Sequence, residues 1–352
     1  MNPHAQLCPK CKADGKDGKV QVHSQKARRY RCKVCGKTFS ERYGTAYYGL
    51  KKDEALFTVV VTLLAYGCPP QAIVEAYGLD PRTVRRWYHR AGQHSHGVHA
   101  MTVWRHQWDL IHVQADEIKV RVQGGVMWLT LALMVSTRLW LGAAVDTVRS
   151  KGMIVECLQQ VARCALCRPL LLAVDGLNMY QTAIEKAFRA RHPVGKGGRM
   201  KYVGWGNVRL TQVVKARGNQ RGNIEPVVTI GTQEETAHLR QRSGGGRKIN
   251  TAFIERFNAT VRQRLACLTR RSRAALKQRA GLENGIFLMG CVYNFCTYHR
   301  SLAVALYLTP RRRHWVRRTP AMAAGLTDHR WSLREVLEFK VIPGTACPRY
   351  RA

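Results

Sequence analysis

Three consecutive apolar segments decide the fold, and they read LIHVQADEIKVRV (110–122), GGVMWLTLALMVS (124–136) and RLWLGAAVDTV (138–148). Each is rich in β-branched and large apolar residues, and short turn signals separate them, so we expect three strands in hairpin succession with the third ending at Asp146. A helical pattern follows from Ser150 to Val161, and LLLAVD (170–175) has the composition of a buried strand. The order predicts an α/β domain with a mixed sheet.

Two carboxylates lie in these strands, Asp116 in the first segment and Asp175 at the end of LLLAVD. Three strands, a helix and a fourth strand describe an RNase H-like fold, in which the first and fourth strands are neighbours, so both acids would meet at one sheet edge. Carboxylates this close repel each other unless cations separate them, and Mg²⁺ prefers a few carboxylates with water and phosphate oxygens. We therefore expect a site for Mg²⁺ or Mn²⁺. By strand alternation Glu117 should face the other way, and Asp146 should cap a turn or helix.

A third carboxylate, Glu255, opens the helical segment NTAFIERFNATVRQR (250–264), which follows a glycine-rich loop. Asn250 or Thr251 can cap that helix. Taken singly, a strand-end Asp is more often a cap and a helical Glu is more often solvated. Asp116, Asp175 and Glu255 together predict two-metal phosphoryl transfer. A basic face continues along the helical region to about residue 289, and the residues of this region predicted to contact DNA are Asn258, Arg262, Arg270 and Arg271.

Four cysteines near the N-terminus form two Cys-x-x-Cys pairs, Cys8 with Cys11 and Cys32 with Cys35. Four thiolates at this spacing suit tetrahedral Zn²⁺, and a module so small could not fold on its apolar residues alone. The alternative is two disulfides or unpaired thiols. We predict a structural zinc ribbon over residues 1–45.

A helical pattern begins near Lys51, with Ala55, Val59, Thr62, Leu63 and Tyr66 at three- and four-residue spacing. PPQAIVEAYGLDPRTVRRWYHRAG (69–92) then predicts two helices with a turn at Gly78 and a cap at Asp80, which resembles a helix-turn-helix over residues 50–95. The face expected to enter a major groove carries Arg82, Thr83, Arg85 and Arg86. Exposed arginines without base reading are the alternative. We interpret the His-rich stretch from His89 to His106 as a solvated linker.

The charge of the chain indicates its partner. The formal net charge is +36 and the isoelectric point is near 10.4, with the cations spread along the chain. A polyanion such as double-stranded DNA is the expected partner. No stretch approaches the roughly 18 apolar residues of a spanning helix, so we expect no membrane partner and a cytoplasmic, nucleoid-associated location.

The complete order of motifs, with the C-terminal YNFCTYHRSL (293–302) and RTPAMAAGLTDHRWSLREVL (318–337), resembles bacterial DDE transposases of the insertion sequence 1 type. The resemblance covers nearly the whole chain. It implies that Asp116, Asp175 and Glu255 form the DDE triad. It also implies a DNA transposase that binds the terminal inverted repeats of its insertion sequence, nicks DNA at these ends and transfers the strand to a target. Because two ends must be held together, a homodimer or larger homo-oligomer is expected.

On this interpretation residues 105–300 form the RNase H-like catalytic domain and residues 301–352 a basic C-terminal extension. In the extension, the cationic run 310–318 would contact DNA, and a short helix capped by Thr319 would end at Gly325. Tyr202 and Trp205 either pack within a strand or stack on a splayed base. Two other functions stay open: a DNA-binding regulator without catalysis, and an RNase H-like nuclease that cuts branched DNA.

Overall fold

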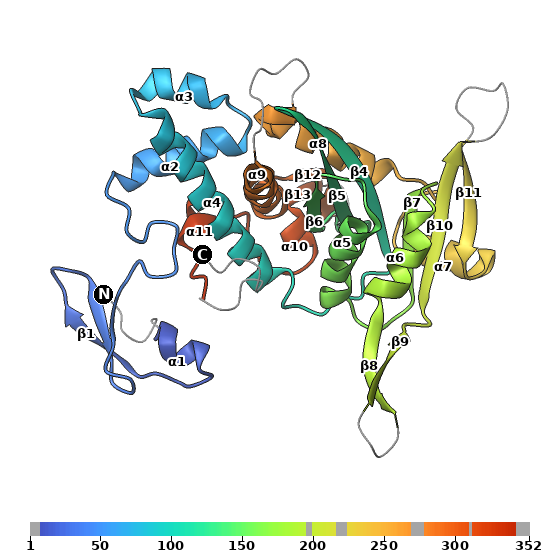
Figure 1. The fold of residues 1–352 in the computed structure, drawn as a ribbon, viewed down its shortest axis with the longest axis horizontal. Coiled ribbons are helices and arrows are strands. Elements are labelled where there is room, and N and C mark those ends of the chain that lie inside the picture. The colour runs from blue at the N-terminus through green and yellow to red at the C-terminus, as the bar shows by residue number, and fades with distance from the viewer. Residues whose placement is uncertain (1–7, 195–198, 216–223, 269–277, 310–311, 343–352) are drawn as a thin grey trace.

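The computed structural model describes residues 8–194, 199–215, 224–268, 278–309 and 312–342 (Figure 1). It is an α/β structure centred on one six-stranded mixed sheet. A small three-stranded sheet and four helices precede the central sheet, and a β-hairpin and two short helices follow it near the C-terminus. Across these ranges, no helix combines the length and the apolar character needed to cross a membrane.

The N-terminal module packs around its cysteines and one aromatic pair. Tyr30 is fully buried and stacks on Phe39, with ring centroids 5.9 Å apart. Few other apolar side chains pack there, so the cysteines form a large part of its interior. The module contains α1 (Pro9–Ala13) and the antiparallel strands β1 (Val20–Ser24), β2 (Arg29–Cys32) and β3 (Thr38–Ser40), in the order β1-β2-β3.

Three helices follow: α2 (Glu54–Ala65), α3 (Pro70–Tyr77) and α4 (Pro81–Thr102). The predicted turn and cap between α3 and α4 are present. Gly78 has the left-handed φ of 57° that ends α3, and the Asp80 carboxylate accepts the backbone N–H of Arg82 at 2.8 Å.

The buried face of α2 differs from the spacing noted in the sequence. Val59 and Tyr66 are 43% and 50% exposed. The inward face instead carries Phe57, Val60, Val61, Leu64 and Ala65. Two adjacent faces of this helix satisfy helical spacing, and Phe57 packs edge-on against Trp87 of α4 with ring centroids 5.4 Å apart. Tertiary packing therefore selects the face.

The predicted solvated linker at His89–His106 is wrong, because α4 continues through it to Thr102. His99 is fully buried, and its Nε2 lies 2.9 Å from the Leu141 carbonyl oxygen. The ring also contacts Trp140, with centroids 4.4 Å apart. A neutral imidazole is a flat ring with one donor and one acceptor, so it can pack in an apolar core when it has a hydrogen-bond partner. The sequence pattern did not reveal that His99 lies in such a core.

The central sheet has the strand order β11-β10-β7-β4-β5-β6. The first three strands are antiparallel neighbours, as predicted, and β7 pairs with β4 in parallel. Strand β10 is parallel to β7, and β11 is antiparallel to β10. The strands are β4 (His112–Val122), β5 (Gly125–Met134), β6 (Trp140–Asp146), β7 (Leu170–Asp175), β10 (Val208–Lys215) and β11 (Ile224–Ile230).

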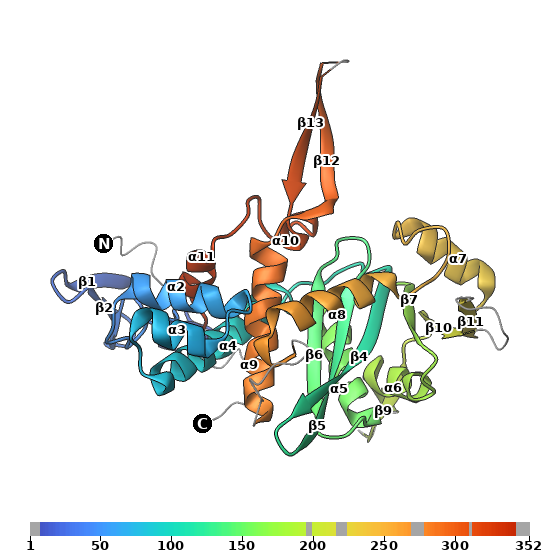
Figure 2. The same cartoon turned by 90° about the horizontal axis from the view of Figure 1, so that it is seen from above.

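Helices cover the sheet, and Figure 2 shows α8 lying across its strands. Side chains of β4 alternate between two sets of partners: Gln114 and Asp116 contact α8, whereas Glu117 contacts α6. As predicted, Asp146 caps a turn, since it accepts the Thr147 N–H and the Ser150 hydroxyl at the start of α5. The helices around the sheet are α5 (Lys151–Cys164), α6 (Met179–Ala187), α7 (Gln233–Arg242), α8 (Ala252–Arg264) and α9 (Arg279–Cys291).

The helical region expected to run on from Glu255 is interrupted. After α8, a 3-10 turn, η2, covers Ala266–Leu268, and α9 begins only at Arg279. Residues 284–291 of α9 are all buried, so this part has no basic face. Helices α4 and α9 pack together and supply residues to both large hydrophobic clusters, one under the sheet and one around α2. A π-helical turn, η3 (Val292–Cys296), follows α9.

Two hairpins project from the body of the molecule. The first pairs β8 (Arg189–Val194) with β9 (Arg199–Gly204), and Figure 1 shows it extending away from the sheet. The second pairs β12 (His299–Thr309) with β13 (Arg312–Arg318), and it stands clear of the body in Figure 2. Much of the predicted basic connector is therefore strand β13. Thr319 caps α10 (Pro320–Ala323) as expected, and α11 (Leu333–Glu338) follows.

Candidate active site

Three acidic side chains meet where β4 and β7 run side by side. One carboxylate oxygen from each of Asp116, Glu117 and Asp175 lies within 4.8 Å of the other two. The parallel register explains this, because Gln114 pairs with Ala173 and two further residues along each strand lead to Asp116 and Asp175. Residues two apart on a strand share a face, so both aspartates lie on the same face as Gln114 and Ala173.

Asp116 is held at both oxygens. Its Oδ1 accepts the backbone N–H of Glu117 at 2.8 Å, and its Oδ2 accepts the side-chain amide of Asn258 at 2.7 Å. Burial raises the pKa of Asp116 to about 6, and the negative charges of Glu117, Asp175 and Glu255 add to the rise. The site thus concentrates negative charge, which a bound cation would relieve.

Glu117 points to the face opposite Asn258, as strand alternation requires, yet its carboxylate still belongs to the acidic cluster. The side chain is fully buried and has two partners. The Tyr180 hydroxyl of α6 donates to Oε1, and Arg149, just before α5, donates to Oε2 from Nη2 at 2.7 Å. Burial raises the pKa of Glu117, and these two hydrogen bonds oppose that rise.

Asp175 is the last residue of β7 and is more open, with its side chain 41% exposed. Its Oδ1 accepts the backbone N–H of Leu177 at 3.2 Å, and its Oδ2 lies 3.4 Å from Arg149 Nη2. The turn after the strand thus orients one oxygen of this carboxylate, and the second oxygen faces the guanidinium.

Glu255, the third predicted acid, lies beside the cluster rather than among its three closest members. It is exposed on the first turn of α8, and its Oε1 accepts the Thr251 hydroxyl at 2.6 Å. Its charge contributes to the raised pKa of Asp116, which places it in electrostatic reach. Of the two predicted caps, Thr251 occupies the N-cap position without a side-chain capping bond, and Asn250 before it accepts the Ala252 N–H at 3.0 Å.

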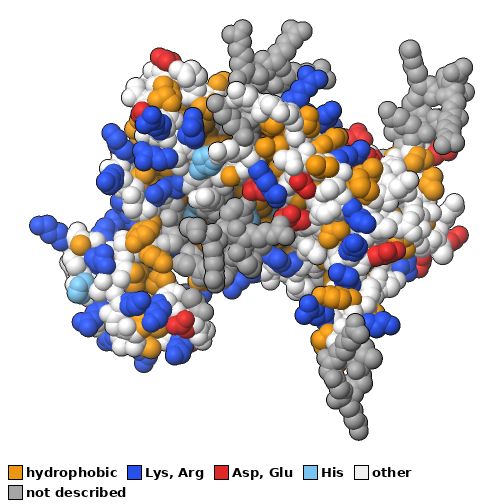
Figure 3. Space-filling view, viewed as in Figure 1, with side chains coloured by type: hydrophobic (Ala, Val, Ile, Leu, Met, Phe, Trp, Pro, Cys, Tyr) orange, Lys and Arg blue, Asp and Glu red, His pale blue; other side chains and the backbone are white. Residues whose placement is uncertain are grey.

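The residues predicted to contact DNA fall in different surroundings. Asn258 is 1% exposed, and its amide is used by Asp116. Arg262 is exposed on α8, while Arg270 and Arg271 lie outside the described residues. On α4, Arg82, Arg85 and Arg86 are exposed and Thr83 is half-buried. Figure 3 shows Lys and Arg side chains over the N-terminal module and helices α2 to α4.

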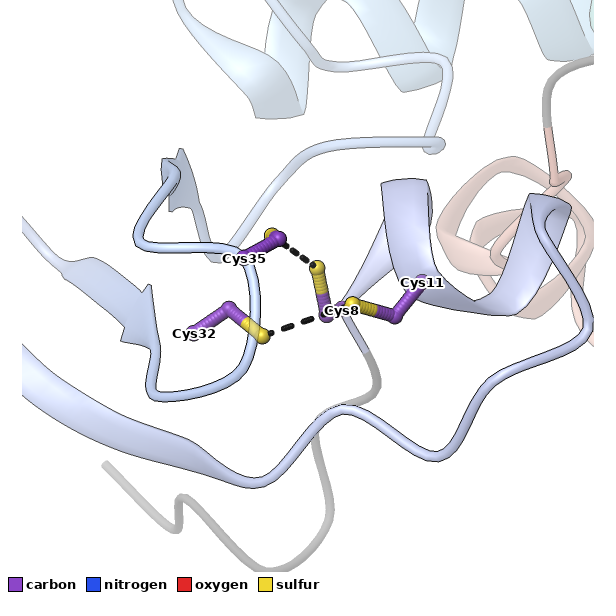
Figure 4. A group of neighbouring side chains, drawn as sticks. All are labelled: Cys8, Cys11, Cys32 and Cys35. Atoms are coloured by element: carbon purple, nitrogen blue, oxygen red, sulfur yellow. Dashed lines mark hydrogen bonds between the residues drawn. The ribbon is translucent and has the colours of Figure 1, made fainter.

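The four cysteines converge as predicted, and Figure 4 shows them facing one another. The Sγ atoms of Cys8 and Cys35 are 3.5 Å apart, and those of Cys11 and Cys32 are 3.6 Å apart. A tetrahedron with metal–sulfur bonds of about 2.3 Å places its sulfurs roughly 3.8 Å apart. The four thiols can therefore hold one metal ion with little rearrangement.

Sequence reasoning missed three residues of the acidic site: Arg149, Tyr180 and Gln114. A glutamate inside an apolar strand needs a buried partner, which was the available signal for Arg149 and Tyr180, but the chain offers many arginines and tyrosines. The donor set of carboxylate oxygens fits a hard cation such as Mg²⁺ or Mn²⁺.

In comparisons with known proteins, no family model matches this chain, and no curated protein matches it.

Proposed function

We propose that this protein is a DNA transposase that cuts DNA at the ends of its insertion sequence and joins the cut strand to a target. The observation that carries the proposal is the meeting of Asp116 and Asp175 at one face of a mixed sheet, with Glu255 in electrostatic reach, in a chain of net charge +36. The six-stranded sheet is compatible with an RNase H-like catalytic domain.

In this proposal Asp116, Asp175 and Glu255 hold Mg²⁺ or Mn²⁺. Bound divalent ions supply activation of the attacking oxygen and stabilisation of the leaving oxygen during in-line displacement. The chain's own residues prepare the site. Asn258 and the Glu117 backbone orient Asp116, the Leu177 N–H orients Asp175, and the Thr251 hydroxyl holds Glu255 near the first turn of α8. Loss of such an orienting contact typically lowers metal affinity or activity by about 10–100-fold.

The N-terminal half supports site-specific DNA binding. The Cys₄ cluster is compatible with a zinc ribbon, and α3, the turn at Gly78 and α4 have the order of a helix-turn-helix. Arg82, Arg85 and Arg86 then present donors to phosphates and base edges of the terminal inverted repeats. We further propose a homodimer or larger assembly that holds two ends, in the bacterial cytoplasm with the nucleoid.

The test is a plasmid that carries the DNA flanking the gene, incubated with protein and Mg²⁺ or Mn²⁺. We expect metal-dependent nicking at the flanks and joined products. Asp116→Asn, Asp175→Asn and Glu255→Gln should abolish both steps without loss of DNA binding, because each removes one carboxylate of the site. Glu185→Gln is the matched control, since Glu185 is an exposed carboxylate on α6.

Three outcomes would replace the proposal. Tight binding to the flanks without cutting by the wild type would identify a DNA-binding regulator. Cutting of branched DNA without joining would identify a nuclease. Cutting that survives all three acidic substitutions would place the chemistry elsewhere in the chain.

A further inference from the structure

One cation lies inside the acidic cluster. Within the described part of the chain, Arg149 is the only Lys or Arg with an ion pair to Asp116, Glu117 or Asp175. It belongs to the connection between β6 and α5, directly before Ser150, whose hydroxyl accepts the Met153 N–H and starts α5. The Ser150 hydroxyl also donates to Asp146, the last residue of β6, so Ser150 is bonded to both α5 and β6. Arg149 is thus attached to fixed secondary structure.

The Glu117 carboxylate forms the shortest ion pair of Arg149. Its fully buried carboxylate accepts from Tyr180 at one oxygen and from both Nε and Nη2 of Arg149 at the other, at 3.3 and 2.7 Å. A buried carboxylate without partners would cost several kcal/mol, so this pairing is strongly favoured over separation. Tyr180 itself is fully buried, and burial followed by the charge of Glu117 keeps its pKa well above the ordinary value, so it donates as a neutral hydroxyl.

The other side of the guanidinium is open. Nη1 of Arg149 has no acceptor among the described residues, and the side chain is 33% exposed. Its second ion pair, with the partly exposed Asp175, is longer at 3.4 Å. The Trp128 ring lies 5.1 Å from the guanidinium carbon and limits its movement on one side. A planar guanidinium held at one edge presents its free donors in the fork geometry that matches phosphate oxygens.

We propose that Arg149 donates hydrogen bonds to a phosphate oxygen of the DNA strand being cut, and that Glu117 and Tyr180 position it rather than serve as metal ligands. The inference rests on the proposed function and deepens it. A phosphate that approaches Asp116, Asp175 and Glu255 meets three negative charges. A fixed guanidinium at the same place offsets that repulsion and stabilises charge that develops on the phosphate.

The test separates Arg149 from the metal-binding carboxylates. Arg149→Ala should lower the rate of metal-dependent cutting at saturating DNA by about 10²-fold, as for loss of a positioned donor to a developing charge. Mn²⁺ affinity of the DNA-free protein, measured by calorimetric titration, should not weaken, because a cation beside Asp175 is removed, whereas Asp116→Asn should weaken it strongly. Added guanidinium ion should restore part of the Arg149→Ala rate. Glu117→Gln and Tyr180→Phe should lower the rate in the same direction and retain Mn²⁺ binding.

Arg168→Ala is the control, because Arg168 pairs with Asp109 near the opposite end of β7 and is 62% exposed. It should keep the wild-type rate, and melting curves show whether each variant folds. Arg149→Lys keeps the charge without the fork, so a full rate in that variant would reduce the role to charge alone and overturn the phosphate fork. Full cutting by Arg149→Ala would overturn the inference and leave the transposase intact. Loss of Mn²⁺ binding in Glu117→Gln would make Glu117 a ligand. A wild type that never cuts would remove both proposals.

Discussion

Asn258 shows how one side chain can control the candidate site. It lies on α8, where helical spacing places it one turn after Glu255, and it is 1% exposed. Its amide donates to Asp116 Oδ2 at 2.7 Å, on the side of that carboxylate away from the Glu117 backbone. The sequence placed this residue beside the acids correctly but assigned it to DNA. Its burial and its bond favour orientation of Asp116.

We predict that Asn258→Leu weakens Mn²⁺ binding and metal-dependent cutting by roughly 10–100-fold, as for other residues that orient a metal ligand. Leucine keeps the volume, so the helix should still pack, but Asp116 loses a donor. Calorimetric titration with Mn²⁺ and the plasmid assay measure the two effects. Gln263→Leu, an exposed position on the same helix, is the control. Unchanged Mn²⁺ affinity in Asn258→Leu would show that Asp116 needs no such support.

Among the structural elements, the N-terminal module depends most on its ligands. Its interior is little more than the cysteines with Tyr30 and Phe39. We predict that a zinc chelator releases one metal equivalent and unfolds residues 8–40, because binding energy is folding energy in so small a module. Hydrogen exchange should increase there and stay unchanged in β4 to β7. Cys11→Ser should act like the chelator, whereas Cys157→Ser, a buried cysteine of α5, should not release metal.

Helix α8 is tied to the sheet by a contact that no local pattern could reveal. Gln114, on β4, accepts the backbone N–H groups of Phe253 and Ile254 at 3.0 and 2.9 Å, and its amide donates to the Asn250 carbonyl. Strands β4 to β7 and helices α5 and α8 were predictable, because period and turn signals are local, whereas strands β10 and β11 were not predicted. The partners of Gln114, Glu117 and Arg149 were not, because side-chain pairs far apart in sequence depend on sheet register.

The same contact gives a prediction. Gln114→Leu should destabilise the protein by about 1–3 kcal/mol, since it leaves buried donors at the start of α8 unpaired. Hydrogen exchange should rise at residues 253 and 254 of α8 before it rises in the sheet, and cutting should fall because Glu255 lies on this turn. Gln233→Leu, at an exposed position of α7, provides the comparison. Equal protection of 253 and 254 in wild type and Gln114→Leu would contradict this role.

At the scale of the whole molecule, α4 and α9 join helices α2 and α3 to the sheet. The two helices approach tightly at Gly92, where an added Cβ would lie 2.6 Å from the Asn284 Cα. We predict that Gly92→Ala lowers the free energy of unfolding by about 1–3 kcal/mol, because the helices must separate. Gly152→Ala, on α5 where an added Cβ would make only an ordinary contact with Ser150 Oγ at 3.6 Å, should instead raise stability by up to about 1 kcal/mol through helix propensity. Urea unfolding measures both, and equal effects would contradict close packing at Gly92.

Two buried histidines, His99 and His112, make the fold sensitive to acid. Burial lowers the pKa of His99 and of His112 from the ordinary 6.5 to about 3, and both are 0% exposed. Because the pKa of each histidine is lower in the folded protein than in the unfolded chain, the unfolded chain binds more protons below about pH 6.5. Stability is therefore complete above that pH and falls as pH decreases toward 3, by roughly 1.4 kcal/mol per pH unit for each histidine.

Urea midpoints at pH 7.5, 6.0 and 5.0 measure this slope. His99→Gln can still bond to the Leu141 carbonyl but cannot titrate, so its loss of stability on acidification should be smaller than that of the wild type. His23→Gln, at an exposed position of β1, should leave the slope unchanged. An identical slope in wild type and His99→Gln would mean that other groups dominate acid unfolding. A reduced slope would show that His99, which joins α4 to the sheet through Leu141, contributes to acid unfolding.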